Sequence, residues 1–231
     1  MTSYQTPTAT FGARPAPALV QQLLIGAFGW MFAGLLLTAG VAFVVQSSVS
    51  LTTAAAQLLL PIIIGQLALA MVLSFGINKL SAMVSLLLFF VYAATMGLTI
   101  GLIVQFYTTG SVAAAFVSSS AMFGGAAIYG KVTQRDLSAI GSMAVMALIG
   151  IIVASLINVF LQSSGVNWII SLLGVGVFVV LTAWDVQRIT NGQLAAVMKS
   201  AERATVFAAF QLYLDFVNLF LFLLRLFGSR R

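Results

Sequence analysis

Seven long apolar segments, separated by short polar stretches, make up most of this chain. Each segment is close to the roughly 20 residues that an α-helix needs to cross a bilayer. The runs are continuous, so they lack the alternating pattern of strands in an outer-membrane barrel. The pattern therefore predicts an all-α, polytopic membrane protein, a bundle of seven transmembrane helices. The predicted spans are residues 23–45, 54–75, 82–106, 112–129, 140–161, 168–186 and 204–227.

A polar N-terminal segment, residues 1–18, precedes the first of these spans. Its Thr, Ser and Pro residues are typical of a disordered tail. The apolar run that follows is too long for a signal peptide and shows no convincing cleavage site. The sequence therefore predicts a short cytoplasmic tail followed by one transmembrane domain over residues 19–231.

The composition supports a membrane protein, because 61% of the residues are hydrophobic and only 6% are charged. A soluble domain carries roughly 25% charged residues. The net charge of +6 comes from Lys and Arg residues scattered between apolar spans. This distribution indicates membrane orientation rather than nucleic-acid binding. The chain has no Cys and no His, so thiol chemistry and an imidazole switch near neutral pH are excluded.

Basic residues are unevenly divided between the loops, which predicts the orientation. If each span crosses once, one side holds Arg14, Lys79, Lys131, Arg135, Arg188, Lys199 and Arg203. The opposite loops, residues 46–53, 107–110 and 162–167, carry no charge. Basic loops stay in the cytoplasm, so the N-terminus is predicted to be cytoplasmic. Three residues, Arg225, Arg230 and Arg231, conflict with this rule if the last segment crosses. The length of that segment favours a crossing, and a re-entrant segment is the alternative.

Two of the four acidic residues, Asp185 and Asp215, lie inside apolar segments. A charge at the bilayer centre costs roughly 3 kcal/mol on insertion scales, so such residues usually mark a functional interior. Asp185 shares a helix face with Arg188, three residues later, and a local ion pair is the simpler interpretation. For Asp215 the simpler interpretation is a buried hydrogen bond between helices.

The last span also carries a polar stripe, made of Gln211, Asp215, Asn218 and Arg225 at offsets of four and seven. These offsets place the four side chains on one helix face. We expect that face to point into the protein rather than toward lipid. The two carboxylates would then converge.

Two carboxylates in one poorly solvated site do not both ionise easily, and they titrate as a unit. We therefore expect Asp185 and Asp215 to act as a pH sensor and gate that holds one proton near neutral pH and separates when both are charged. The pair, with Asn218, could also hold Ca²⁺, but only weakly, because Ca²⁺ takes six to eight oxygen ligands. Weak binding suits permeation. Lys79 is either an orientation charge or a partner of these aspartates when the site closes.

The depth of the two aspartates argues against their contact. Asp185 is predicted near the cytoplasmic end of its helix, whereas Asp215 is about 11 residues, or roughly 16 Å, into its own. Contact therefore requires the last helix to begin nearer Phe207 or the preceding helix to continue past Arg188.

Small residues predict where the helices pack closely. Gly97 and Gly101 form a small-xxx-small pair, and Ser118, Ser119 and Ser120 with Gly124 and Gly125 form a second small surface. Both are expected to lie against neighbouring helices.

Four segments resemble the Bax inhibitor-1 family, the transmembrane Bax-inhibitor-motif proteins, in its bacterial branch. They are residues 77–101, 119–160, 181–189 (LTAWDVQRI) and 212–228 (LYLDFVNLFLFLLRLFG). The resemblance implies a seven-helix bundle of the plasma (inner) membrane, with the last helix central, and a pH-sensitive calcium leak controlled by an aspartate pair. That pair maps onto Asp185 and Asp215. Trp184 stands where the family commonly has Tyr.

Two functions follow as hypotheses. The first is the calcium leak, with Ca²⁺ and protons as the permeant and sensed ions and no resident cofactor. The second is a non-conducting partner or modulator of a membrane-anchored ATP-dependent protease, to which some bacterial relatives are linked. No enzyme is expected, because the sequence has no phosphate loop, metal-ligand cluster or nucleophile with a base. An intramembrane aspartyl protease would need Gly-containing motifs that neither aspartate has.

Overall fold

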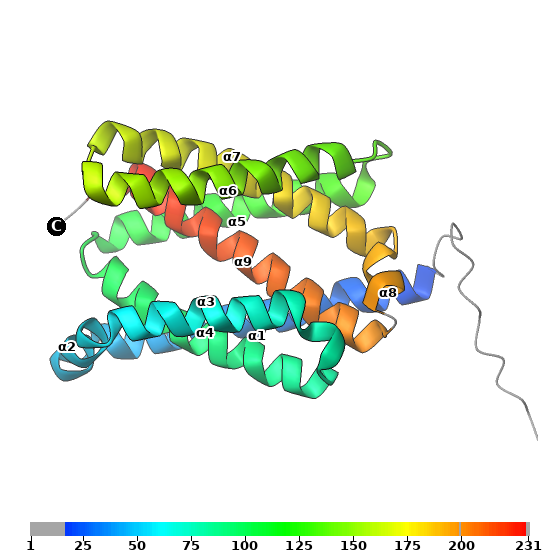
Figure 1. Cartoon of the computed structure of the whole chain (residues 1–231), viewed down its shortest axis with the longest axis horizontal. Helices are drawn as coiled ribbons and strands as arrows, with labels where there is room; N and C mark the ends of the chain where they lie inside the picture. The colour runs from blue at the N-terminus through cyan, green and yellow to red at the C-terminus, as the bar shows by residue number, and fades with distance from the viewer. Residues whose placement is uncertain (1–16, 199, 230–231) are drawn as a thin grey trace, which may run out of the picture.

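The computed structural model describes residues 17–198 and 200–229, and within them it is helical with no strand (Figure 1). Its elements are α1 (Pro17–Gln46), α2 (Val49–Gln57), α3 (Leu59–Phe75), η1 (Ile77–Lys79), α4 (Ala82–Val104), α5 (Thr109–Val132), α6 (Ser138–Leu161), α7 (Ser164–Thr190), α8 (Gln193–Met198) and α9 (Ala201–Phe227). Among the described residues, six helices are long and apolar enough to cross a membrane, and the bent pair of α2 and α3 makes up to a seventh. The predicted all-α, polytopic bundle is confirmed.

The first helix begins earlier than the predicted domain boundary at residue 19. It starts at Pro17, where a proline is well tolerated because the first turn of a helix needs no donated N–H. Residues 1–16 of the predicted tail lie outside the described residues.

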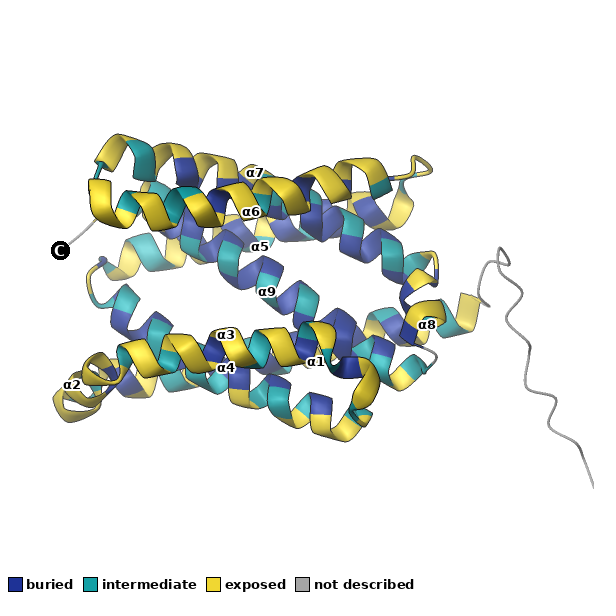
Figure 2. Ribbon diagram, viewed as in Figure 1, coloured by how far each residue is buried: buried dark blue, intermediate teal, exposed yellow. Residues whose placement is uncertain are grey.

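The last helix, α9, runs through the middle of the bundle and packs against α1, α4, α5 and α7 (Figure 1). Most of its residues from Ala204 to Leu224 are buried, whereas the fully described α6 buries only Gly141, Ala144 and Ile151. Figure 2 shows this contrast, with α9 mostly buried and α6 mostly exposed. The central position expected for the last helix is therefore confirmed.

The second predicted span is not a single helix. It breaks at Leu58 into α2 and α3, whose axes differ by 67°. Pro61 lies in the first turn of α3 and has no N–H to donate to the carbonyl of Gln57, and its ring would collide with that carbonyl. The continuous span expected over residues 54–75 is wrong for this reason, although its apolar residues remain helical.

The helices connect at two opposite ends of the bundle. Loops 76–81 and 133–137 and the short helix α8 lie at one end, called here the basic end because Lys79 and Arg135 lie there (Figure 1). Loops 47–48, 105–108 and 162–163 lie at the other, called the opposite end. The α9 helix leaves the basic end, and Ser229 beyond it bonds to the loop at the opposite end: Thr108 N–H donates to its carbonyl at 3.1 Å. The last helix thus crosses the whole bundle, as expected from its length.

Glycines bring α4 against α1. A Cβ at Gly97 would lie 2.7 Å from Val41 Cβ and 2.8 Å from the Thr38 carbonyl oxygen, so only Gly fits there. Close packing at Gly97 and Gly101 is confirmed. The second predicted surface is not a contact at its glycines, because no described atom would lie within 4 Å of a Cβ at Gly124 or Gly125.

A buried hydrogen-bond chain joins three helices beside this contact. The Thr38 hydroxyl on α1 donates to the Ala93 carbonyl on α4 at 2.8 Å. Because its proton is used there, Thr38 Oγ1 accepts from the Tyr213 hydroxyl on α9 at 2.6 Å. The Phe89 and Tyr92 rings pack edge-on against Tyr213. These contacts set the position of α9 two residues before Asp215.

Candidate functional site

Asp185 lies in the last two turns of α7, on the face that packs against α9. It is only 6% exposed. Arg188 Nη1 donates to Asp185 Oδ1 at 3.2 Å, and the Arg188 guanidinium lies 4.7 Å from the centre of the Trp184 ring. The local ion pair that the spacing suggested is therefore formed, and the guanidinium also stacks on the aromatic ring.

Asp215 lies in the middle of α9, is 4% exposed, and approaches α7 at the turn that carries Asp185. The two carboxyl groups are close enough for their charges to interact, and Thr182, three residues before Asp185 on α7, lies near Asp215. Thr182 also donates to the Phe178 carbonyl at 2.7 Å. Asp215 Oδ2 is enclosed and has no hydrogen-bond partner among the described residues. The structure thus brings the two predicted aspartates together.

The oblique path of α9 removes the expected difference in depth. The first of the two conditions for contact, a start of the last helix nearer Phe207, is not met because the helix begins at Ala201, and the second is met by two residues because α7 continues past Arg188 to Thr190. Instead, α9 starts beyond the end of α7 and crosses the bundle diagonally (Figure 1). Its residues meet α7 only after several turns, and at that point Asp215 lies beside Asp185.

The rest of the polar stripe does not face this pair. Asn218 is half-buried and donates to the Leu214 carbonyl of its own helix at 2.8 Å. Gln211 is half-buried, and Arg225 is exposed beside the Phe222 ring. The expectation that the whole stripe points inward is therefore wrong beyond Asp215. The reason is the position of each residue around the helix axis. Successive residues of an α-helix are rotated by about 100°, which places the centre of the exposed stripe of α9 about 80–90° away from Asp215.

Of the two predicted basic partners, Arg188 contacts Asp185, whereas Lys79 does not reach the pair. Lys79 is exposed in η1 at the basic end, and in residues 17–198 and 200–229 the Asp185–Arg188 contact is the one ion pair present. Lys79 therefore acts here as an end charge and does not contact the aspartates.

Gln187, which the sequence did not single out, ties the site to the neighbouring loop. The Leu137 N–H donates to Gln187 Oε1 at 2.8 Å, and Gln187 Nε2 donates to the Arg135 carbonyl at 2.7 Å. The loop lies just before α6, whose N-cap residue Leu137 has no side-chain cap. Gln187 is 5% exposed, two residues after Asp185. The sequence signal that could have identified Gln187 is a polar side chain within an apolar segment.

The same loop is further ordered by Asp136. Its Oδ1 accepts from the Ser138 N–H at 2.9 Å, at the start of α6. The side-chain and backbone hydrogen bonds from Ser138 hold the pKa of Asp136 below its ordinary value. Asp136 thus supports the beginning of α6, as its position in the sequence suggests.

Two glycines hold the Asp185 turn of α7 between its neighbours. A Cβ at Gly130 of α5 would collide with the Ala183 carbonyl, and one at Gly141 of α6 would collide with the Trp184 ring. The backbone around Asp185 is therefore enclosed by α5 and α6 on two sides.

The site offers few oxygen ligands. It has two carboxylates and the Thr182 hydroxyl, and Arg188 occupies one oxygen of Asp185. No group of three or more His, Cys, Asp or Glu side chains suited to a metal occurs in the described part of the chain. Ca²⁺ takes six to eight oxygen ligands, so the side chains at this site supply fewer oxygens than a full Ca²⁺ coordination shell.

Comparison with known proteins gives a consistent match over the transmembrane part of the chain. Residues 20–231 match the family model described as "Inhibitor of apoptosis-promoting Bax1". The chain is 45% identical over 218 residues to the inner membrane protein YbhL of Escherichia coli, which covers 92% of this chain and 93% of that protein. It is 42% identical over 212 residues to an uncharacterized protein of Deinococcus radiodurans, and the match covers 91% of this chain and 92% of that protein. An uncharacterized membrane protein of Streptococcus pyogenes is 40% identical over 159 residues, and the match covers 66% of this chain and 67% of that protein.

Proposed function

The chain belongs to the Bax inhibitor-1 family of membrane proteins, and from this premise we propose that it is a pH-sensitive cation leak of the plasma membrane, with calcium as its permeant ion. Its gate would be the contact between α7 and α9, and its proton sensor the pair of Asp185 and Asp215. The observation that carries the proposal is the enclosed, unpartnered Asp215 Oδ2 beside a second carboxyl group, in the described residues.

A proton on this pair has a structural consequence. Protonation turns one carboxylate oxygen into a hydrogen-bond donor, which can bond to the other carboxyl across the two helices. Loss of that proton leaves two like charges in a poorly solvated place, and their repulsion favours separation of α7 from α9. Arg188, which neutralises part of the Asp185 charge, is the cation that the structure places against the pair.

The same arrangement suits a passing divalent cation. Two carboxylates attract Ca²⁺, while the small number of oxygen ligands keeps the binding weak. An ion in a permeation pathway must be able to leave as well as enter. In this proposal calcium is the transported ion, and no covalent bond is made or broken.

The test is calcium flux into liposomes that contain the full chain and a trapped calcium dye, measured between pH 6 and pH 8. Asp185→Asn and Asp215→Asn remove one titrating group each and preserve side-chain size. We expect the wild-type flux to change across this range and the flux of each variant to lose most of that pH response. Asp136→Asn, which changes an aspartate in the loop before α6, is the matched control and should retain it.

An unchanged flux and pH response in both aspartate variants would refute the gating proposal. Liposomes that stay silent with the folded wild-type chain would refute the leak and favour the alternative, a non-conducting partner of a membrane-anchored protease. Copurification of such a protease with the full chain, and its loss when residues 1–18 are removed, would support that alternative.

A further inference from the structure

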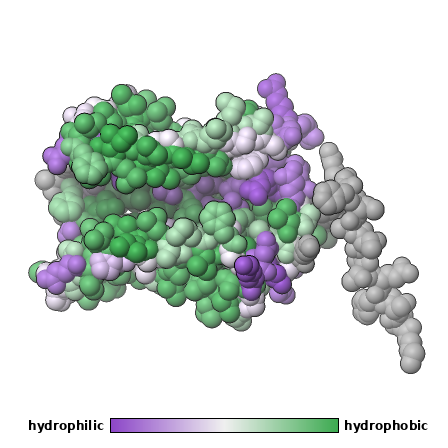
Figure 3. All heavy atoms as spheres, in the orientation of Figure 1, coloured by the Kyte–Doolittle hydropathy of each residue, from purple (hydrophilic) through white to green (hydrophobic). Residues whose placement is uncertain are grey.

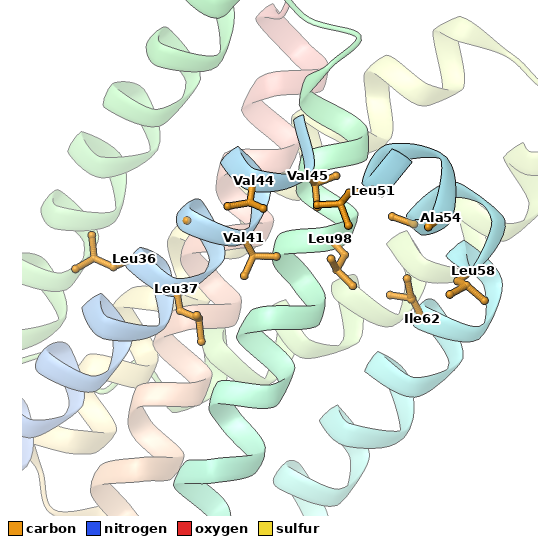
Figure 4. A pocket seen from close by; sticks show the side chains of 12 residues that line it. Leu36, Leu37, Val41, Val44, Val45, Leu51, Ala54, Leu58, Ile62 and Leu98 are labelled. Carbon is orange, nitrogen blue, oxygen red and sulfur yellow. The ribbon is translucent and has the colours of Figure 1, made fainter. Parts of the chain in front are cut away.

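An apolar groove of about 600 Å³ lies between α1, α2, α3 and α4 near the opposite end of the bundle, away from the aspartate pair. Its lining consists of Leu, Val, Ile, Ala and Gly residues, with no polar side chain among them. Figure 4 shows Leu98 of α4 between Val41 of α1 and Ile62 of α3, with Leu58 at the break between α2 and α3. The groove is therefore formed where the second span is broken.

The short helix α2 covers one wall of this groove with an apolar face. The groove-lining residues are Leu51, Ala54, Ala55 and Leu58, at positions i, i+3, i+4 and i+7. This spacing places them on one side of a helix and leaves Ser50, Thr53 and Gln57 on the other. Thr52 Oγ1 donates to the Val45 carbonyl at 2.7 Å and fixes α2 to the end of α1.

The groove is continuous with the surface of the bundle that faces lipid. Its rim residues Leu36, Val44 and Leu58 are more than half exposed, at 58%, 53% and 55%. Figure 3 shows hydrophobic residues covering the sides of the molecule and hydrophilic ones gathered at its ends, as expected of a protein immersed in hydrocarbon. A groove that opens onto this surface meets acyl chains.

Chemistry and size together select the occupant. A polar ligand would bury groups that no lining side chain can satisfy. A protein helix about 10 Å wide would fill about 600 Å³ with roughly 8 Å of its length, fewer than two turns. The volume instead falls in the usual range of small-ligand sites, roughly 300–1,000 Å³. A hydrocarbon chain is both apolar and thin enough.

We propose that this groove is a binding site for one acyl chain of a membrane phospholipid, held between α1, α4 and the broken span of α2 and α3. The bound chain supplies contacts to the apolar face of α2, which packs against few other residues and buries only Ala55 within its described sequence. The headgroup of that lipid lies beside the polar side of α2, at the level of Ser50 and Thr53. This site is independent of the proposed cation leak.

The groove offers a pair of matched variants. Gly40 lines it, Gly29 lies on the same helix outside it, and both are exposed with no described atom within 4 Å of an added Cβ. Gly40→Leu therefore fills the groove without a clash, and Gly29→Leu adds the same side chain to the lipid-facing surface elsewhere. Ala54→Phe fills the groove from the α2 wall as a second variant.

The experiment uses the full chain in bilayers that contain a phospholipid with a photoreactive diazirine in the middle of one acyl chain. After irradiation, peptides are analysed by mass spectrometry. We expect adducts to concentrate several-fold on residues 36–62 relative to the lipid-facing α6, and to fall at least threefold in Gly40→Leu and Ala54→Phe but not in Gly29→Leu. Equal labelling of α6 and residues 36–62, or unchanged labelling in both filled variants, would overturn the proposal.

Discussion

Gln187 shows how a single side chain can join the aspartate turn to the neighbouring loop. It gives one hydrogen bond and receives another from the backbone of residues 135–137, two residues after Asp185. Its side-chain oxygen also accepts from the backbone N–H of Leu137, the N-cap residue of α6, which has no side-chain cap of its own. The loop at the basic end and the α7 turn that carries Asp185 are thereby coupled through one buried amide.

Gln187→Leu should destabilise the protein through this loop. The substitution leaves the Leu137 N–H and the Arg135 carbonyl without their partner. An unsatisfied buried group costs about 1–3 kcal/mol, which applies to the buried Leu137 N–H, whereas Arg135 is exposed and its carbonyl can bond to water. We expect a lower free energy of unfolding and faster hydrogen exchange at Leu137. Gln105→Leu is the control, since Gln105 bonds only to the Leu102 carbonyl of its own helix in the described chain. Equal stability of the two variants would show that the loop does not depend on Gln187.

At the scale of the elements, glycines set the contact between α1 and α4, and a glycine also lies in the contact between α7 and α9, where a Cβ at Gly174 would lie 2.7 Å from the Phe222 ring. The glycines of α4 let the two backbones approach, and the Thr38 bridge to Ala93 and Tyr213 fixes their register against α9. On the other side, Gly130 and Gly141 hold α7 against α5 and α6. The α9 helix lies between these two groups of helices and packs against both.

Gly97→Ala tests the first of these contacts with one methyl group. The new Cβ would lie 2.7 Å from Val41 Cβ, so α1 and α4 must move apart, and overpacking of this kind costs about 1–3 kcal/mol. We expect a clear fall in unfolding midpoint in detergent. On α3, no described atom would lie within 4 Å of a Cβ added at Gly65. Gly65→Ala should therefore be neutral or slightly stabilising, because Ala favours the helix. A fall of the same size in both would contradict the close packing.

For the whole molecule, the crossing of α9 places the two ends of the described chain at opposite ends of the bundle. The basic end collects the charged loops, and the opposite end has loops of Ser, Thr, Gln and Tyr residues. The positive-inside rule then predicts that the basic end, and with it Pro17 at the start of α1, faces the cytoplasm.

Because the chain has no native cysteine, single cysteines can test this orientation directly. Ser47→Cys and Ser164→Cys lie at the opposite end, and Asn78→Cys and Gln134→Cys at the basic end. In intact spheroplasts, a membrane-impermeant maleimide should label the first two and reach the others only after the membrane is opened. Labelling of Asn78→Cys in intact cells would reverse the orientation.

Much of this protein follows from its sequence alone. Apolar runs of membrane-spanning length dictate helices, since a backbone in hydrocarbon must satisfy its own hydrogen bonds. The loop charges predict orientation, and two acids in apolar segments identify the candidate site. The helical inference is confirmed because it depends on the transfer of each segment between water and lipid, which is a local property of that segment, and the orientation stays a prediction.

The tertiary structure decided the remainder, because it depends on how helices meet. The diagonal course of α9 brings Asp215 to Asp185 despite their different depths, and the same course turns Gln211 and Asn218 away from the pair. The partners of Gln187 are backbone groups about 50 residues away in the sequence. Helical periodicity relates only residues within one helix, so it could not predict these partners. Helical spacing defines the faces of each helix, but only packing against all of its neighbours decides which face meets which.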